Sequence, residues 1–132
     1  MAGEKHLDRL LSVMSPTLSP EEFVFCSYKD ASYGDHRDLA PIASISEREG
    51  LTLVITRASA DEQKIEYESV FKRISLNVHS SLDAVGLTAA FSSKLASHGI
   101  SANVIAGYFH DHIFVQSEQA EAAVAALNEF SG

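Results

Sequence analysis

The pattern of apolar and polar positions in the first half of the chain predicts one helix followed by three strands. Apolar side chains recur at helical spacing over residues 4–14, and a proline follows where such a helix should end. Residues 15–20 contain two prolines and indicate a turn, whereas the aromatic and β-favouring residues 22–28 predict a strand. The polar residues 30–40 predict a loop. Apolar residues on either side of Gly50 then predict a hairpin, because glycine adopts a positive φ at little cost.

The second half predicts a strand, a helix, a hairpin and a final helix. After a polar stretch, apolar and polar residues alternate over 74–78, which is typical of a half-buried strand. Apolar side chains then fall four residues apart in a helix that ends before Gly99, and a hairpin covers 102–116. Ser80 or Ser81 is expected to cap the first helix and Ser117 the second. The buried stripe of the last helix is expected to comprise Ala120, Val124, Leu127 and Phe130.

The order of these elements predicts an α+β fold. Residues 70–132 supply five of the six elements of a ferredoxin-like βαββαβ unit, and only an edge strand is missing. Residues 1–69 show strand, loop, strand, strand, which resembles a degenerate copy of that unit with its first helix reduced. We therefore expect two tandem units, 1–69 and 70–132, in which the N-terminal half lends the missing edge strand.

Composition and charge indicate which kinds of partner the protein can have. The 132 residues suffice for one ordinary domain or two very small ones that share a core. Ten lysines and arginines against 18 aspartates and glutamates give a formal net charge of −8, and the basic residues are scattered, so we expect no nucleic-acid partner. Without a secretory signal or an apolar run of about 20 residues, the chain is expected to be cytoplasmic and not membrane-associated. The single cysteine, Cys26, lies in a predicted strand and is expected to be a buried, inert thiol.

The entry to the first long helix is the segment richest in candidate chemistry. Residues 80–87 lead from a strand directly into a helix, where several backbone N–H groups have no partner within the helix. Such a site attracts carboxylates, and Gly86 has no side chain to block a ligand that approaches the backbone. The alternative is that Gly86 only permits close packing of the helix on the strand.

The sequence around this segment resembles the ACT domain. The similarity rests on Asp83-Ala84-Val85-Gly86-Leu87, on Leu95 and on Gly99-Ile100-Ser101-Ala102-Asn103-Val104. It is closer still to small proteins with two tandem ACT-like units, through Ser80-Ser81-Leu82, Val85-Gly86-Leu87-Thr88 and His110-Asp111-His112. Related segments occur in the eukaryotic tandem-ACT arginine sensors. Val85 replaces the proline that is common before the glycine in ordinary ACT domains.

The resemblance implies a non-catalytic regulatory protein that binds an amino acid between its ACT units. One wall of the implied site comprises Ser80, Ser81, Asp83, Val85, Gly86, Leu87 and Thr88, and another comprises Asn103, Val104 and Ile105. Asp111 matches a ligand-pocket aspartate of the arginine sensors and would pair with an ammonium or a basic side chain; the alternative is a hairpin-turn aspartate that bonds to its own backbone. The family also implies a homodimer, and no cofactor is expected.

A small metal-dependent or acid–base enzyme is the alternative function. His110 and His112 lie two apart on a predicted strand and so share a face, with His79 as a candidate third metal ligand. Asp111 next to His112 could act as an acid–base pair. The sequence contains no nucleophile motif and no phosphate-binding loop, so neither a catalytic residue nor a metal ligand is assigned.

Overall fold

The computed structural model describes residues 7–77 and 86–130, which form two compact units. Unit 1 comprises residues 1–20 and 72–132, and unit 2 comprises residues 21–71. The first twenty residues thus belong with the C-terminal half of the chain. The elements in chain order are α1 (Leu7–Val13), β1 (Pro16–Tyr28), η1 (Arg37–Leu39), β2 (Ala43–Glu47), β3 (Gly50–Thr56), α2 (Arg57–Glu62), β4 (Phe71–Leu76), α3 (Leu87–Ser97), β5 (Asn103–Ala106), β6 (Asp111–Gln116), η2 (Ser117–Gln119) and α4 (Ala120–Asn128).

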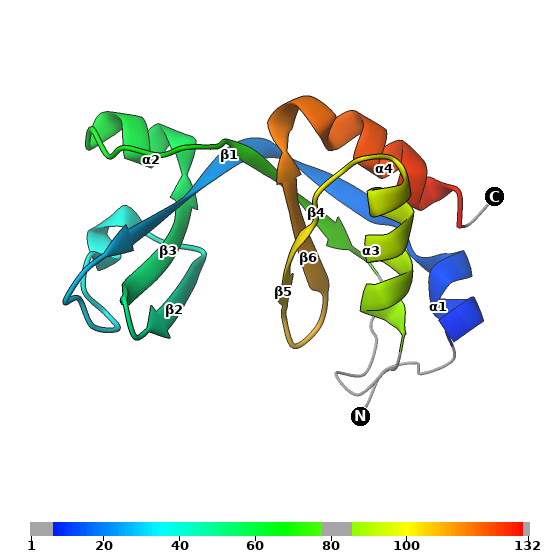
Figure 1. Cartoon of the computed structure of the whole chain (residues 1–132), viewed down its shortest axis with the longest axis horizontal. Coiled ribbons are helices and arrows are strands. Elements are labelled where there is room, and N and C mark those ends of the chain that lie inside the picture. Colours follow the sequence, from blue (N-terminus) through cyan, green and yellow to red (C-terminus); the bar gives the residue numbers. More distant parts are fainter. Residues whose placement is uncertain (1–6, 78–85, 131–132) are drawn as a thin grey trace. The chain divides into compact units, whose positions relative to one another are not determined.

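Unit 1 is a β-sheet with α3 and α4 packed on one face (Figure 1). Its strands lie in the order β1-β4-β6-β5, so the start of β1 supplies the edge strand that the second half lacks, as the sequence predicts. The backbone N–H of Asn77, just past β4, donates to the carbonyl of Ser15 at 2.9 Å. Between sheet and helices lies a core of fully buried side chains that includes Phe91, Leu95 and Ile113, with Leu10 added by α1.

Unit 2 repeats this plan with a smaller core. Its strands lie in the order β2-β3-β1, with Leu53 opposite both Cys26 and Ser44. Leu51, Leu53 and Ile55 pack beneath α2 and η1. The three-residue η1 stands where unit 1 has the eleven-residue α3, which confirms the prediction of a copy with a reduced first helix.

Residues 16–20 form the start of β1, so the prediction of a turn over 15–20 was wrong. The turn was inferred from Pro16 and Pro20, yet the φ that proline imposes also fits extended backbone. Pro16 is the first residue of the strand, where a missing N–H is tolerated. Pro20 precedes Phe23, the first residue of β1 that pairs with β3, so its missing N–H breaks no bond in that ladder.

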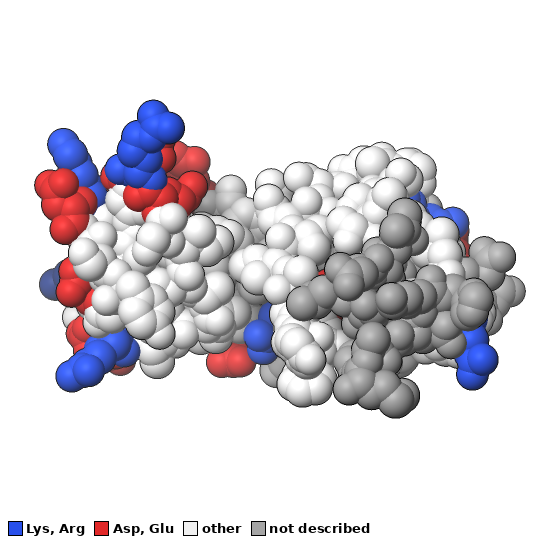
Figure 2. Space-filling view, turned by 90° about the horizontal axis from the view of Figure 1, so that it is seen from below, with Lys and Arg blue, Asp and Glu red and all other residues white. Residues whose placement is uncertain are grey.

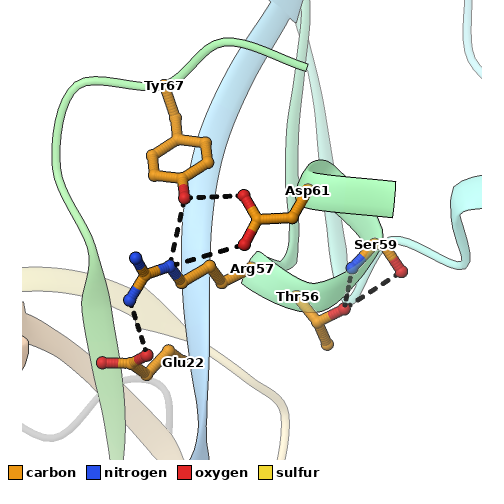
Figure 3. A network of polar contacts seen from close by, with 6 residues as sticks. All are labelled: Glu22, Thr56, Arg57, Ser59, Asp61 and Tyr67. Carbon is orange, nitrogen blue, oxygen red and sulfur yellow. Dashed lines mark hydrogen bonds and ion pairs between the residues drawn. The ribbon is translucent and has the colours of Figure 1, made fainter. Parts of the chain in front are cut away.

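The sequence also failed to predict α2, because Ala60 is the only side chain of this six-residue helix that is buried. Capping and polar contacts hold the helix in place (Figure 3). Thr56 accepts a hydrogen bond from the backbone N–H of Ser59 at 3.1 Å. Arg57 donates to Glu22 at 3.1 Å and to the hydroxyl of Tyr67 at 3.0 Å. That hydroxyl donates in turn to Asp61 at 2.8 Å, so the network ties α2 to β1 and to the segment before β4.

The predicted caps fare differently. The N-cap of α3 is Gly86, whereas Ser80 and Ser81 lie outside the described residues. The prediction that Ser117 caps the last helix was wrong, because η2 precedes α4 and the Ser117 hydroxyl is buried without a hydrogen-bond partner in the described structure. The burial of the last helix follows the predicted period, with Ala120 and Leu127 buried and Val124 and Phe130 partly buried.

We predict that Gly50→Ala destabilises the protein more than Gly99→Ala does. A Cβ at residue 50 would lie 2.7 Å from the carbonyl oxygen of Tyr28, whereas one at residue 99 would have no atom within 4 Å. Gly99→Ala should therefore cost about 1 kcal/mol for its left-handed backbone alone, and Gly50→Ala about 3 kcal/mol. Urea denaturation of both variants measures these costs. Equal losses would contradict the argument that close backbone packing fixes the hairpin.

Candidate functional site

The start of α3 and the β5–β6 hairpin lie at the same end of unit 1 (Figure 1). This follows from the chain path, since β4 runs toward that end, α3 returns from it, and β5 runs back to the hairpin. Of the residues implied for the first wall, Ser80, Ser81, Asp83 and Val85 lie outside the described residues. The described candidates are Gly86, Leu87 and Thr88 at the start of α3, Asn103, Val104 and Ile105 along β5, and Asp111 next to the hairpin turn.

Gly86 begins α3 in a conformation that other residues rarely adopt. Its φ is 91°, and none of the side chains in residues 7–77 and 86–130 caps the helix at this position. A Cβ here would lie 3.2 Å from Cδ2 of Leu7, so α1 packs against the side from which a side chain would project. Leu87 is 3% exposed and belongs to the core, whereas Thr88 is exposed. The backbone geometry thus favours glycine at residue 86, and a side chain there would also require Leu7 to shift.

The three candidates on β5 face both sides of the sheet. Val104 packs against the helix-covered core, opposite Ile113 of β6. Side chains alternate along a strand, so Asn103 and Ile105 point to the other face. The side-chain amide of Asn103 donates to the backbone carbonyl of Phe114 at 3.2 Å. The strand therefore brings Asn103 and Ile105 together and separates them from Val104.

Asp111 is the charged candidate at this end. It is the first residue of β6, is partly buried and pairs with Ala106. Burial raises the pKa of its carboxyl above the ordinary value, and the nearby His112 opposes that shift. By alternation along β6, Asp111 shares the helix-covered face with Ile113. Its carboxylate therefore lies on the face of the sheet that α3 and α4 cover.

His112 points to the opposite face of the sheet. Its Nδ1 lies 2.9 Å from the hydroxyl oxygen of Ser75. Burial lowers the pKa of His112, and the positive charge of Arg73 and the neighbouring His110 add to that shift. Asp111 and His112 thus do not converge on one reacting atom. In residues 7–77 and 86–130 there is no group of three or more histidine, cysteine or acidic side chains that could hold a metal ion, and His79 lies outside them.

A cavity of about 410 Å³ lies in unit 2, between the loop that follows β1 and the start of β2. None of the site residues inferred from the sequence lines it. Basic and acidic side chains are interspersed over the face of unit 2 shown in Figure 2, so neither sign dominates that surface.

Two family models cover nearly the whole chain. Both describe the ACT domain, and they match residues 2–72 and 68–129. The chain belongs to the ACT-domain family. These matches confirm both the resemblance to tandem ACT proteins and the ferredoxin-like fold expected from the sequence.

Solved structures share the fold of this tandem ACT protein over most of its length. A Vibrio cholerae protein of unknown function, described as a possible transport protein, is 52% identical, covers 96% of each chain and superposes with a TM-score of 0.87. A protein from Agrobacterium tumefaciens is 15% identical, covers 89% of each chain and has a TM-score of 0.69. The regulatory subunit of aspartate kinase from Thermus flavus is 15% identical over 92% of this chain and 99% of its own, with a TM-score of 0.68. No curated protein matches significantly.

Two further observations bear on the environment of this tandem ACT protein. No described helix is long and apolar enough to cross a membrane. Cys26 is partly buried against the core of unit 2, and burial raises the pKa of its thiol. A raised pKa keeps the thiol protonated and therefore weakly nucleophilic.

We predict that His112→Gln reduces the loss of stability on acidification below pH 6.5. The pKa of His112 is lowered in the folded protein from an ordinary value of 6.5, so the unfolded chain binds this proton more readily. The stability that the neutral imidazole contributes is fully present above pH 6.5, and it is lost as the pH falls toward the lowered pKa of the folded state. Urea denaturation of wild type and variant at several pH values between about 4 and 7 measures the difference.

The control for this prediction is His98→Gln, since His98 is exposed at the end of α3. That variant keeps His112 and should keep its contribution to the acid slope. If His112→Gln followed the same pH profile as wild type, burial of His112 would not be coupled to folding.

Proposed function

We propose that this tandem ACT protein is a non-catalytic regulatory protein that binds an amino acid or a similar small metabolite. Membership of the ACT family supports a regulatory, ligand-binding role. The observation that carries the amino-acid assignment lies at one end of unit 1. There, the start of α3, which no described side chain caps, and the partly buried carboxylate of Asp111 supply the two kinds of group that an α-amino acid requires.

The start of α3 offers donors for a carboxylate. The carbonyl of Gly86 accepts the first helical hydrogen bond, from Ala90 at 2.9 Å, so the N–H groups of residues 87–89 have no acceptor within the helix. Gly86 has no side chain that could accept from them, and no other side chain in the described part of the chain does so. The partial positive charge at a helix N-terminus attracts anions. The α-carboxylate of an amino acid is such an anion, and the exposed Thr88 adds a hydroxyl donor.

Asp111 would pair with the α-ammonium group of the ligand. Burial disfavours the charged form of this carboxyl in the free protein, which is why its pKa is raised. An ammonium partner would offset that cost, and charge-assisted hydrogen bonds are stronger than neutral ones. Binding would therefore relieve the free-energy cost of burying the charged carboxyl of Asp111, and that relief would add to the affinity.

The structural relatives support a regulatory role. Among them is the regulatory subunit of aspartate kinase from Thermus flavus, which has the same fold along almost its whole length. The proposal also includes a homodimer in the cytoplasm. Among the described strands, β2 and β5 each have a hydrogen-bonded neighbour on one side only, and such an open edge favours pairing with a second chain.

We predict that Asp111→Asn weakens amino-acid binding while leaving the free protein as stable or more stable. Loss of the ion pair should reduce the binding free energy by about 1.5 to 3 kcal/mol, measured by calorimetry on the amino acid that raises the melting temperature most. A ligand at a hundredfold its Kd should stabilise the wild type by about 2.7 kcal/mol. The raised pKa of Asp111 means that its charged form destabilises the fold near pH 7, so the neutral amide removes that cost.

The matched control is Glu62→Gln, which neutralises an exposed carboxylate in unit 2. It should leave affinity unchanged. An unaltered Kd in Asp111→Asn would indicate that Asp111 is only a residue of the hairpin. The absence of any stabilising amino acid would contradict the proposed function as a whole. A side chain at residue 86 is a poor probe, because it would strain the backbone and press on Leu7 whether or not ligand binds there.

A further inference from the structure

Two neighbouring strands of unit 1, β4 and β6 (Figure 1), carry basic and hydroxyl side chains on the sheet face opposite α3 and α4. On β4, Ile74 is buried in the helix-covered core, so Arg73 and Ser75 on either side of it point to the opposite face. His112 of β6 lies on the same face, because its Nδ1 is 2.9 Å from the hydroxyl oxygen of Ser75. All three side chains are partly buried. One face thus holds a guanidinium, a hydroxyl and an imidazole.

Positive charge from two neighbours acts on the imidazole of His112. Burial lowers the pKa of His112, and the charges of Arg73 and His110 lower it further. Asp111 acts in the other direction, but its side chain lies on the helix-covered face. The neighbouring strand β5 places the uncharged Ile105 opposite His112. We call Arg73, Ser75, His110 and His112 the basic cluster.

One nitrogen of the basic cluster is buried without a hydrogen-bond partner. Nδ1 of His110 has no such partner in residues 7–77 and 86–130. The carbonyl oxygen of His110 accepts from the N–H of Gly107 at 2.9 Å, and a Cβ at residue 107 would lie 2.8 Å from that oxygen and 3.3 Å from Nε2 of His112. The hairpin turn therefore packs closely against both histidines. A buried nitrogen of this kind costs free energy unless a group from outside the polypeptide satisfies it.

The hydrogen bond between Ser75 and His112 makes the donors of the basic cluster depend on protonation. In the neutral tautomer with a bare Nδ1, the hydroxyl of Ser75 donates to that nitrogen. In the protonated imidazole, both ring nitrogens are donors, so Nδ1 donates to the hydroxyl oxygen instead. The hydroxyl proton of Ser75 can then bind another acceptor. Protonation of His112 thus adds a positive charge and a donor, and both favour an anion.

We propose that the basic cluster binds a phosphate group, either as the free ion or on a small metabolite. The guanidinium of Arg73 and the hydroxyl of Ser75 donate to the phosphate oxygens. The two histidines supply positive charge, and His110 also supplies the unsatisfied nitrogen. A phosphate fits this set of donors better than a carboxylate because it offers more acceptor oxygens and more charge.

The proposed phosphate site is compatible with the acidic character of the whole chain. The formal net charge of −8 repels anions at long range. At physiological ionic strength, however, charges farther away than about 8 Å are largely screened, so the nearest groups decide. The site shares no residue with the amino-acid site proposed above, and neither proposal depends on the other.

The first test follows the imidazole signals of the full-length protein by NMR during pH titrations in sulfate and in chloride at equal ionic strength. Sulfate is the probe because it keeps both charges over this range, whereas a phosphate group takes up a proton at about pH 6. We expect sulfate to raise the pKa of His112, because an anion favours the protonated form. Affinity for sulfate should be about tenfold higher at pH 5 than at pH 7.5. The exposed His98 is the internal control, and its titration curve should be the same in both salts.

Calorimetry at pH 6 distinguishes the two sources of phosphate. We expect saturable binding of inorganic phosphate or of glycerol 3-phosphate at concentrations up to about 10 mM. Tighter binding of glycerol 3-phosphate would assign the site to a phosphorylated metabolite, and tighter binding of inorganic phosphate would assign it to the free ion. Acetate, which has one charge and two oxygens, should bind at least about tenfold more weakly than either.

Matched variants locate the phosphate site. Arg73→Gln and Ser75→Ala should each weaken phosphate binding by about tenfold. Lys72→Gln removes the same charge from the adjacent residue of β4, whose side chain points to the other face. Ser97→Ala removes an exposed hydroxyl at the end of α3. Both control variants should bind phosphate as wild type does. If Arg73→Gln did not fold, Ser75→Ala and the titration of the wild type would still decide.

The outcomes separate this proposal from the amino-acid site. An identical titration curve of His112 in sulfate and chloride would overturn the phosphate site, as would equal affinity for acetate and phosphate. Equal phosphate binding by Ser75→Ala and Ser97→Ala would also overturn it. A protein that bound an amino acid but neither phosphate nor sulfate would support the proposed function and refute this site, and the converse result would do the reverse.

Discussion

Both units depend on the burial of one sheet face beneath helices. A strand whose side chains alternate presents an apolar face, and each fully buried leucine, isoleucine or phenylalanine contributes about 1.5 to 3 kcal/mol when it is covered. In unit 1, α3 and α4 cover that face completely enough for Ile74, Leu76 and Ile113 to have no exposed surface. In unit 2, α2 and η1 cover Leu51 and Ile55, but Ile42 at the start of β2 keeps 41% of its surface exposed. The two units therefore differ in how completely helices bury the apolar face of their strands.

The parts of the fold with a strong apolar period could be predicted from the sequence. The helix around Phe91, the final helix and both hairpins have such a period, and the structure contains all of them. Residues 15–20 could not be assigned correctly, because proline fits both a turn and the first residues of a strand. Helix α2 could not be found from its period because it buries only Ala60, and its capping by Thr56 was the one available signal.

The candidate sites show a sharper limit. Sequence spacing correctly drew attention to Gly86, but it could not reveal that Leu7, far away in the sequence, packs against it. Nor could it show that Asp111 and His112 would both be partly buried, so that the same loss of solvation raises the pKa of the carboxyl and lowers the pKa of the imidazole. The cavity in unit 2 was beyond reach because it results from an element that is reduced, and a pattern search finds what is present.

The loop after β1 has the least regular backbone of unit 2. The loop after β1 holds Asp30, His36 and Ala40 in the left-handed region, which costs about 1 kcal/mol or more at each non-glycine residue. Stacking of the His36 ring on Tyr28, with ring centroids 3.7 Å apart, burial of Leu39 and the hydrogen bond from the Ser32 N–H to Asp35 help to offset that cost.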